Sequence, residues 1–134
     1  MMRSLLFVPG DRPERFEKAA ATGADALILD LEDAVALSAK SAARAAVRSY
    51  LRDAKRGPSL FVRINPLGSA HAHEDLIALL DARPDGIVLP KAEGRASVEA
   101  LAALLGHRVI CGCFPGPAER RTFWLSKPEG GKQP

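Results

Sequence analysis

The chain has 134 residues, of which 47% are hydrophobic and 26% are charged. This length and balance predict one globular domain with a sizeable core and exclude a disordered chain. Lys and Arg number 19 against 16 Asp and Glu, for a net charge of +3, but the two signs are interspersed and only 5% of the residues are aromatic. The basic stripe with interleaved aromatics that is typical of nucleic-acid binding is missing, so we expect no nucleic-acid partner.

The first residues and the cysteines predict a cytoplasmic protein. The apolar run before Pro9 and Gly10 is only a few residues long, which is too short for the core of a signal peptide or for a membrane span. Cys111 and Cys113 are separated by one residue, a spacing poorly suited to a disulfide, and no second Cys or His pair completes a zinc site. We therefore expect two reduced thiols and no membrane contact.

The first half of the chain predicts two strand and helix units. Residues 5–8 and 26–31 are apolar runs of the kind found in parallel strands buried on both faces. Between them, Asp11 has capping-box spacing to Glu14 and Pro13 suits a first turn, so a helix is expected before a stop at Gly23. After the second run, Ser38 is expected to cap a helix that packs on the sheet through the stripe Ala42, Ala45, Ala46 and Leu51.

The second half repeats this order. Apolar runs at residues 60–64 and 87–89 predict the third and fourth strands, leucines at helical spacing predict helices at 74–82 and 96–105, and a fifth strand is expected to start near Val109. Residues 111–134 are rich in Pro, Gly, Lys and Arg and have no apolar period, so we expect a divergent, disordered tail there. A reading-frame change and a gene truncation would both produce such a tail.

An alternating order of strands and helices predicts a parallel sheet with right-handed crossovers, either doubly wound or a barrel. The expected strands begin near residues 5, 26, 60, 87 and 109, a rhythm that matches the roughly 30 residues of each unit in an eightfold barrel. We therefore predict an α/β fold, an incomplete TIM (β/α)8 barrel with about four βα units. The half-barrel is assigned to residues 1–110 and the tail to residues 111–134.

Polar side chains follow every predicted strand. In parallel α/β folds functional groups gather at the carboxyl ends of the strands, because the following loops converge there. Here these ends carry Gly10, Asp11 and Arg12 in the first unit, Asp30, Glu32 and Asp33 in the second, Arg63 and Asn65 in the third, and Lys91 and Glu93 in the fourth.

The acidic residues of the second unit are candidate catalytic residues. Asp30 and Glu32 are two residues apart, so an extended segment points both carboxylates the same way. They repel each other unless a cation, a water network or an arginine offsets the charge, which makes a nearby divalent metal a reasonable expectation. Asp33 is a third acidic candidate or the cap of a turn, whereas for Asp11 a helix cap is favoured.

Arg63, Asn65 and Lys91 are candidate substrate-binding residues. Arg63 lies near the end of an apolar strand, where a guanidinium needs an anionic partner, either Asp30, Glu32 or a substrate carboxylate. Its planar fork suits a carboxylate, which makes Arg63 the strongest single candidate. Lys91 either pairs within the protein with Glu32 or Asp30 or contacts the substrate.

Four blocks together resemble the citrate lyase β-subunit branch of the HpcH/HpaI aldolase family: RSLLFVPG at residues 3–10, DLEDAV at 30–35, VRIN at 62–65 and VLPK at 88–91. The resemblance covers about residues 2–110 and implies a Mg²⁺-dependent carbon–carbon lyase that cleaves a 3-hydroxy acyl-CoA such as citryl-CoA or malyl-CoA through a metal-stabilised enolate. It also implies that Arg63 holds the substrate carboxylate and that Asp30, Glu32 and Asp33 lie beside the metal and its waters.

The resemblance also marks what is missing. It places the two direct metal carboxylates at the ends of the fifth and sixth strands, where this sequence has Cys111, Gly112 and Cys113 and then no match. We therefore expect Mg²⁺ as the family's cofactor, with its direct ligands absent from this chain and catalysis incomplete. A half-barrel leaves open sheet edges, so a homo-oligomer or a complementing chain is expected beside the acyl-CoA or organic acid.

Two other functions stay open. The chain could be a non-catalytic binding or assembly module that keeps the anion-binding rim without the metal. It could also be a receiver-like doubly wound domain that uses Asp30 as a phosphoryl acceptor, a hypothesis disfavoured because the acidic cluster follows the second strand and Pro90 precedes Lys91.

Overall fold

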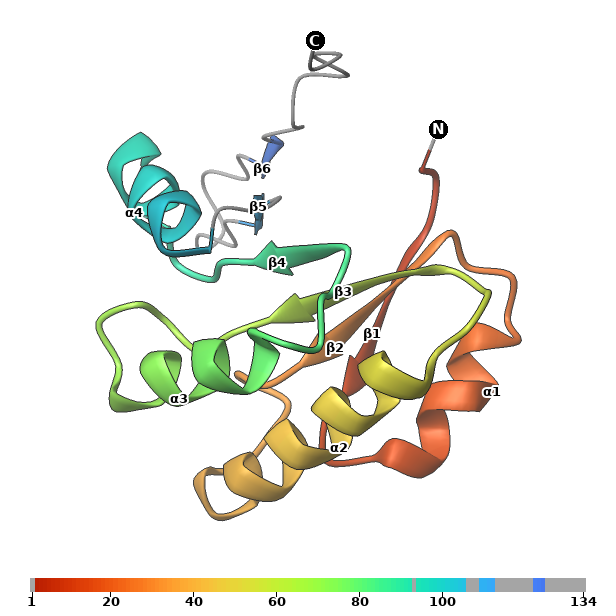
Figure 1. The fold of residues 1–134 in the computed structure, drawn as a ribbon. Coiled ribbons are helices and arrows are strands. Elements are labelled where there is room, and N and C mark those ends of the chain that lie inside the picture. Colours follow the sequence, from red (N-terminus) through yellow and green to blue (C-terminus); the bar gives the residue numbers. More distant parts are fainter. Residues whose placement is uncertain (1, 93, 106–108, 113–121, 125–134) are drawn as a thin grey trace, which may run out of the picture.

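The computed structural model describes residues 2–92, 94–105, 109–112 and 122–124 (Figure 1). The strands are β1 Leu5–Pro9, β2 Ala26–Asp30, β3 Ser59–Arg63, β4 Gly86–Val88, β5 Val109–Gly112 and β6 Thr122–Trp124. The helices are α1 Phe16–Ala20, α2 Lys40–Asp53, α3 Ala70–Leu79 and α4 Arg95–Leu105, and short 3-10 turns at Pro13–Arg15 and Leu37–Ala39 lead into α1 and α2.

The strands form one sheet in the order β1-β2-β3-β4-β5-β6. Pairing is parallel from β1 to β5 and antiparallel between β5 and β6. The order of the described strands does not reverse, whereas a doubly wound sheet requires a switch point where it does. The prediction of four βα units in barrel order is therefore confirmed, and the receiver-like alternative is wrong.

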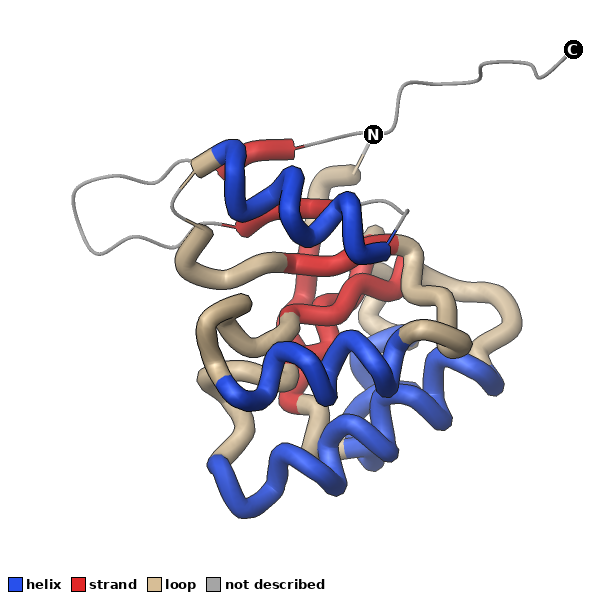
Figure 2. Tube along the Cα trace, turned by 60° about the vertical axis from the view of Figure 1, so that its left-hand side comes forward, coloured by secondary structure: helices blue, strands red, loops and turns tan. Residues whose placement is uncertain are grey.

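The helices cover one face of this sheet (Figures 1 and 2). Their apolar side chains join strand residues such as Leu27, Leu29 and Val62 in one buried core, to which α4 contributes Val98 and Leu101. A core side chain of this size contributes roughly 1.5–3 kcal/mol when it is fully buried. The opposite, inner face carries a small apolar cluster made of strand residues, Ala26, Ile28, Phe61 and Val88.

β1 departs from the expectation that every strand is buried on both faces. Its residues Leu5, Leu6 and Phe7 are 41%, 37% and 39% exposed, whereas every residue of β2 is buried. β1 lies at the edge of the sheet and pairs with β2. Consecutive strand residues point to opposite faces, so both faces of this edge strand are open to solvent among the described residues.

The predicted helix caps are wrong. The residue before the first 3-10 turn is Arg12, with no capping side-chain hydrogen bond, and the residue before α2 is Ala39, again without one. Asp11 therefore does not cap its helix, and Ser38 lies inside the second 3-10 turn. The Oδ1 atom of Asp11 is buried and has no hydrogen-bond partner among the described residues.

The buried stripe of α2 matches the predicted one only in part, because Leu51 is buried and Ala46 packs against the core. Ala43, Val47 and Leu51 face the core, whereas Ala42 and Ala45 are exposed. Val47 and Leu51 are four residues apart, so their larger side chains share a helix face and bury more apolar area than the alanines would. Val47 and Leu51, together with the fully buried Ala43, therefore form the face of α2 that packs on the sheet.

The other predicted helices differ from the observed ones mainly at their boundaries. α3 begins at Ala70 and ends at Leu79, so Leu80 lies beyond it and is 64% exposed. α4 buries Leu101 as expected, while the side chains of Leu104 and Leu105 lie outside the described residues. No described helix is both long and apolar enough to cross a membrane.

The assignment of residues 111–134 to the tail needs one correction. β5 continues through Gly112, and β6 pairs antiparallel with it through Ile110 and Trp124. Thr122, Phe123 and Trp124 are residue types that favour strands, and they form β6 within the segment that is predicted to be a disordered tail. The predicted disorder of the tail otherwise falls on residues 113–121 and 125–134, which lie outside the described residues.

Candidate functional site

The polar ends of β2 and β3 lie side by side. In the parallel register Pro9 pairs with Asp30, Asp30 with Arg63, and Arg63 with Val88. Paired residues of neighbouring strands project from the same face of a sheet. Asp30 and Arg63 therefore continue the inner-face layer above Ile28 and Phe61.

The Asp30 carboxylate is buried and fully engaged. Arg63 donates to it through Nε at 2.8 Å and through Nη2 at 2.6 Å, and the backbone amides of Glu32 and Ala34 donate to it at 2.9 and 3.0 Å. Burial alone would raise the pKa of Asp30, but these hydrogen bonds and the charge of Arg63 outweigh it, so the pKa of this carboxyl is lowered. Asp30 is thus a fixed anion that orients the guanidinium.

Besides Asp30, Arg63 lies close to an aromatic ring and to a second carboxylate. Its side chain is 13% exposed, its guanidinium carbon lies 4.8 Å from the centre of the Phe7 ring, and its Nη2 atom lies 3.7 Å from Glu32 Oε2. Burial opposes its charge, but the Asp30 hydrogen bond raises the pKa of the guanidinium. No described residue accepts a hydrogen bond from Nη1, so this side of the fork is the part that a further anion could reach.

Glu32 lies between two cations. Its Oε2 accepts a hydrogen bond from the Asp33 amide at 2.7 Å, and its Oε1 lies 3.6 Å from Lys91 Nζ. Burial raises the pKa of Glu32, and the neighbouring Asp33 carboxyl adds to that rise, while Arg63 opposes it. Asp30 at the end of β2 and Glu32 in the loop that follows thus have pKa shifts of opposite sign, a contrast typical of functional carboxylate pairs.

Asp33 and Lys91 lie at the outer side of this cluster. The Asp33 side chain is exposed, and its backbone amide holds Glu32. The Lys91 side chain is 66% exposed, and its backbone is in the left-handed region, with φ of 51°. A non-glycine residue held there carries local strain of the kind that gathers at functional sites. Glu93 lies outside the described residues.

Asn65 lies deeper than the other candidates. Its Nδ2 atom donates to the Leu31 carbonyl at 2.9 Å and to Asp75 Oδ2 at 2.7 Å, and its backbone amide donates to the same Asp75 oxygen. Asp75, which is completely buried, also accepts a 2.7 Å hydrogen bond from Arg44 Nε. Both amide hydrogens of Asn65 are therefore used within the protein.

Three residues around the site escaped the sequence reasoning: Phe7, Lys40 and Asp75. Phe7 reads as an ordinary strand residue, and its place under Arg63 depends on strand register. Asp75 falls at helical spacing with buried Ala72 and Leu79, so an acidic residue on an apolar helix face is the sequence feature that could have identified it. Lys40 begins a helix, where a cation opposes the helix dipole, and this unfavourable position is the sequence feature that could have identified it.

The described residues do not fit a directly coordinated divalent ion. They contain no group of three or more His, Cys, Asp or Glu side chains placed to hold a metal. Both Asp30 oxygens already accept hydrogen bonds, and Arg63 and Lys91 supply the positive charge that was expected from a metal beside the two carboxylates. Mg²⁺ prefers octahedral oxygen ligands, including waters, so direct ligands would have to lie outside this group.

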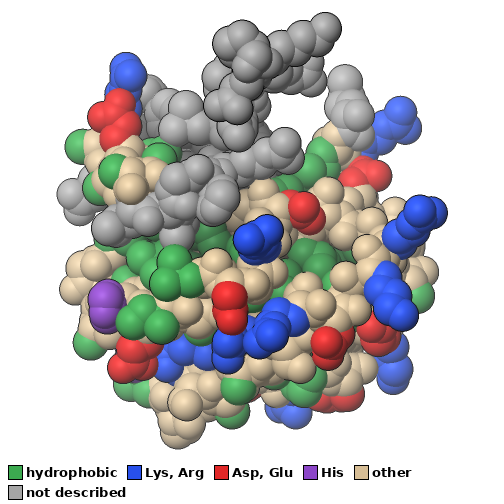
Figure 3. Space-filling view, in the orientation of Figure 1, with side chains coloured by type: hydrophobic (Ala, Val, Ile, Leu, Met, Phe, Trp, Pro, Cys, Tyr) green, Lys and Arg blue, Asp and Glu red, His purple; other side chains and the backbone are tan. Residues whose placement is uncertain are grey.

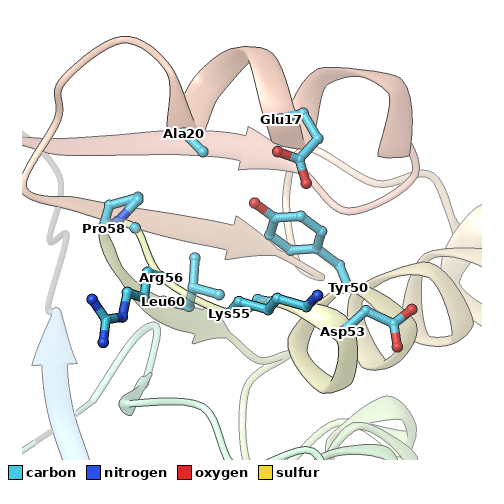
Figure 4. Close-up of a pocket in the computed structure, with 10 residues that line it drawn as sticks. Glu17, Ala20, Tyr50, Asp53, Lys55, Arg56, Pro58 and Leu60 are labelled. Atoms are coloured by element: carbon cyan, nitrogen blue, oxygen red, sulfur yellow. The ribbon is translucent and has the colours of Figure 1, made fainter.

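A separate pocket of about 290 Å³ lies at the other end of the sheet (Figure 4). It is lined by α1, the end of α2 and the loop into β3, with the Tyr50 ring at its centre. Leu60, near the start of β3, borders this pocket, whereas Arg63 ends the same strand. Because barrel enzymes act at the carboxyl ends of their strands, this pocket is not the candidate site.

Charged side chains of both signs are mixed over the described part of the surface drawn in Figure 3, with hydrophobic side chains exposed between them. This matches the interspersed charges of the sequence. The candidate site is therefore defined by the contacts among Asp30, Glu32, Arg63 and Lys91 and not by a broad patch of one sign.

Comparison with known proteins shows the family of the chain. Residues 3–109 match the family model described as HpcH/HpaI aldolase/citrate lyase. The chain is 52% identical over 97 residues to a citrate lyase subunit beta-like protein of Mycobacterium tuberculosis, covering 72% of this chain and 34% of that protein. It is 40% identical over 104 residues to a (3S)-malyl-CoA thioesterase of Cereibacter sphaeroides, covering 77% of this chain and 36% of that protein.

A solved structure has the same fold over most of the chain. The protein CitE from Mycobacterium tuberculosis, in complex with magnesium, acetoacetate and coenzyme A, matches with a TM-score of 0.70 and 47% sequence identity over 82% of this chain and 39% of that chain. The present chain thus spans 34–36% of the length of the two curated relatives named above. On the family match and this shared fold, the chain belongs to the HpcH/HpaI aldolase/citrate lyase family.

Proposed function

We propose that this chain supplies the carboxylate-binding half of a lyase site that cleaves a carbon–carbon bond in a 3-hydroxy acyl-CoA such as citryl-CoA or malyl-CoA. The observation that carries the proposal is the Arg63 guanidinium, which two hydrogen bonds to Asp30 fix at the carboxyl ends of the strands. Its Nη1 side has no acceptor among the described residues, and we propose that it binds a carboxylate of the substrate.

Each candidate residue takes a role from its position. Arg63 binds the carboxylate, and Asp30 keeps the fork in place. Lys91, whose ammonium group is mostly exposed, adds a second positive charge that can turn to an anionic substrate. Asn65 supports the site from inside the protein, because its side-chain amide donates hydrogen bonds to the Leu31 carbonyl and to Asp75.

Glu32 is the group best suited to exchange a proton. Cleavage requires a base to take the proton of the 3-hydroxyl group while the electron pair of the breaking carbon–carbon bond becomes a thioester enolate. A carboxyl whose pKa is raised by burial binds a proton more readily than an exposed one. Asp33, beside it and exposed, links this carboxyl to solvent.

Magnesium enters the proposal as the family's cofactor only. When bound, it would polarise the substrate oxygens and stabilise the enolate. The described residues do not fit direct coordination, so we propose that the metal ligands come from residues outside them. The CitE structure that contains magnesium, acetoacetate and coenzyme A supports this choice of cofactor and substrate class.

The competing function is anion binding without turnover. It is favoured by one observation, the absence of a metal-holding side-chain group among the described residues. A chimera in which residues 3–109 replace the matching segment of the Mycobacterium tuberculosis relative separates the two. With Mg²⁺, the lyase proposal predicts cleavage of malyl-CoA to acetyl-CoA and glyoxylate. EDTA should abolish this reaction.

The assay must also distinguish hydrolysis, because one relative is a thioesterase. Hydrolysis of malyl-CoA would release free coenzyme A thiol and malate, whereas carbon–carbon cleavage leaves the thioester intact. A chimera that binds acetoacetate but turns over no thioester would support the binding module and contradict the lyase. Thiol release without acetyl-CoA would move the proposal to hydrolysis.

We also propose that the open edge at β1 is covered by strands of a complementing polypeptide. β1 is the end strand of the described sheet and its Leu5 and Leu6 are 41% and 37% exposed, and an exposed apolar strand edge is prone to pair with another strand. Light scattering of the chain alone and mixed with the remaining segment of the Mycobacterium tuberculosis relative tests this. A one-to-one complex supports it. A homo-oligomer that ignores the added segment, or a stable monomer, contradicts it.

A further inference from the structure

Lys40 is a buried lysine that contacts three backbone carbonyls. It is the first residue of α2 and is 6% exposed. Its Nζ atom donates to the carbonyl oxygens of Leu31 at 2.9 Å, Glu32 at 3.0 Å and Val35 at 3.2 Å. An ammonium group has three hydrogens, so these bonds saturate it. No described carboxylate forms an ion pair with it.

Burying Lys40 at this position costs free energy, which its hydrogen bonds to the loop must offset. A cation at the start of a helix opposes the helix dipole, and a buried ammonium group loses its hydration. Three carbonyl groups offset that loss only if the loop that carries them holds one conformation. The loop is the segment at residues 31–35 that follows β2 and contains Glu32 and Asp33.

Two peptide groups of this loop are held at both ends. In a trans peptide the carbonyl and the amide hydrogen point in opposite directions, and the structure has no cis peptide bonds among its described residues. The peptide joining Leu31 to Glu32 accepts a hydrogen bond from Lys40 at its oxygen and donates its amide hydrogen to Asp30 Oδ1. The peptide joining Glu32 to Asp33 accepts a hydrogen bond from Lys40 at its oxygen and donates its amide hydrogen to Glu32 Oε2.

We propose that Lys40 is a positioning residue of the site: by binding these two carbonyls it aims the opposite amide hydrogens at the carboxylates of Asp30 and Glu32. Hydrogen bonding to the oxygen also polarises each peptide and strengthens its amide as a donor. Asp30 in turn fixes Arg63. Lys40 thus acts on the anion-binding guanidinium through the loop, without touching substrate. The effect on ligand binding rests on the proposed function, whereas the effect on the two carboxylates does not.

The first measurement needs no variant and uses the 134-residue chain. The ammonium hydrogens of Lys40 should exchange slowly enough with water to give an NMR signal at neutral pH, with couplings to the three carbonyl carbons. Lys18 on α1 is exposed and serves as the control. Ammonium exchange equally fast at both lysines would overturn the proposal.

The second measurement follows the Glu32 carboxyl carbon during a pH titration in Lys40→Met, which keeps the stem and removes the charge. The midpoint should move upward, because the Asp33 amide that lowers this pKa is no longer held. Lys40→Gln, which retains donors, should restore part of the difference, and Lys18→Met should titrate like the wild type. A lysine that only stabilised the fold would lower the denaturation midpoint and leave the titration unchanged, an outcome that rejects the proposal.

Binding of acetoacetate to the same variants is the third measurement. Loss of a group that orients metal ligands costs about 10-fold or more in affinity, and on the same scale Lys40→Met should raise the dissociation constant roughly tenfold while Lys18→Met leaves it unchanged. Equal affinities in Lys40→Met and the wild type would contradict this part of the proposal. If the wild type itself does not bind acetoacetate, the proposed function fails, and the ammonium and titration measurements still decide the role of Lys40. Should Lys40→Met not fold, Lys40→Gln and the wild-type ammonium signal decide it.

Discussion

The Arg63 guanidinium and the Asp30 carboxylate form a side-by-side pair, with Nε to Oδ1 at 2.8 Å and Nη2 to Oδ2 at 2.6 Å. They come from neighbouring parallel strands and are partners in the strand register. Two parallel hydrogen bonds fix the plane of the guanidinium as well as its position. The pair therefore determines that the Nη1 side of Arg63 is the side left for a further anion.

Replacing one member of this pair should cost stability. Asp30→Asn leaves the largely buried Arg63 without its counter-charge, and breaking a buried ion pair in this way costs about 3 kcal/mol or more. Urea denaturation at pH 7 measures the loss. Asp33→Asn, a neighbouring but exposed position, is the control and should change stability little. Equal stability of the two variants would show that the pair contributes nothing measurable.

The same pair predicts a pH dependence. The pKa of Asp30 is lowered from its ordinary value of 3.8, so its stabilising contribution is fully present above 3.8 and is lost as the pH falls through the lower folded-state pKa. Asp30→Asn should lack this part of the acid transition. Urea midpoints measured from pH 5 downward should therefore converge between the wild type and the variant. A constant gap between them would contradict the lowered pKa.

Glu32 should behave in the opposite way. Its pKa is raised from 4.5, so the folded state holds this proton more tightly, and the associated stability is present below 4.5 and lost as the pH rises through the folded-state pKa. Glu32→Gln cannot ionise. Its stability relative to the wild type should therefore increase as the pH rises from 4.5, as thermal denaturation in a pH series would show. A relative stability that falls with rising pH would refute the raised pKa.

Asp75 should matter more than its neighbour Glu74, although both contact Arg44. Asp75 is fully buried and accepts hydrogen bonds from Arg44 and Asn65, whereas the Glu74 side chain is 62% exposed. Asp75→Ala should lower the free energy of unfolding by about 3 kcal/mol. Glu74→Ala should lower it by less than about 1 kcal/mol, as for other exposed pairs. Chemical denaturation of both variants checks the ranking.

Gly10 is predicted to be intolerant of a side chain. A Cβ atom at this position would lie 2.6 Å from the Asp30 carbonyl oxygen, while one at Gly68 would meet nothing within 4 Å. Because the obstacle is backbone, Gly10→Ala must push β1 away from the end of β2, at a cost of about 1–3 kcal/mol. Gly68→Ala is the matched control. Similar denaturation midpoints for both variants would count against this close approach.

The sequence predicted the strand ends better than the helix faces. A short apolar run followed by Asp30 or Arg63 has one reasonable arrangement in a parallel sheet, so their proximity could be expected. The rotation of α2 could not, because its many alanines define no face and Val47 and Leu51 decide it. Asn65 and Asp75 lie on different elements, and only packing reveals that they bond to each other. Lys40 was missed because its partners are carbonyls, which every residue carries.

The most direct test of the central claim is the affinity of the chain for acetoacetate in Arg63→Lys, measured by NMR titration. Lysine keeps the charge but loses the planar fork, so binding should weaken roughly tenfold, the difference expected for one lost strong hydrogen bond. Arg48→Lys, at the exposed pair of Arg48 with Asp81, should bind like the wild type. An Arg63→Lys variant with unchanged affinity would remove Arg63 from the site and contradict the account.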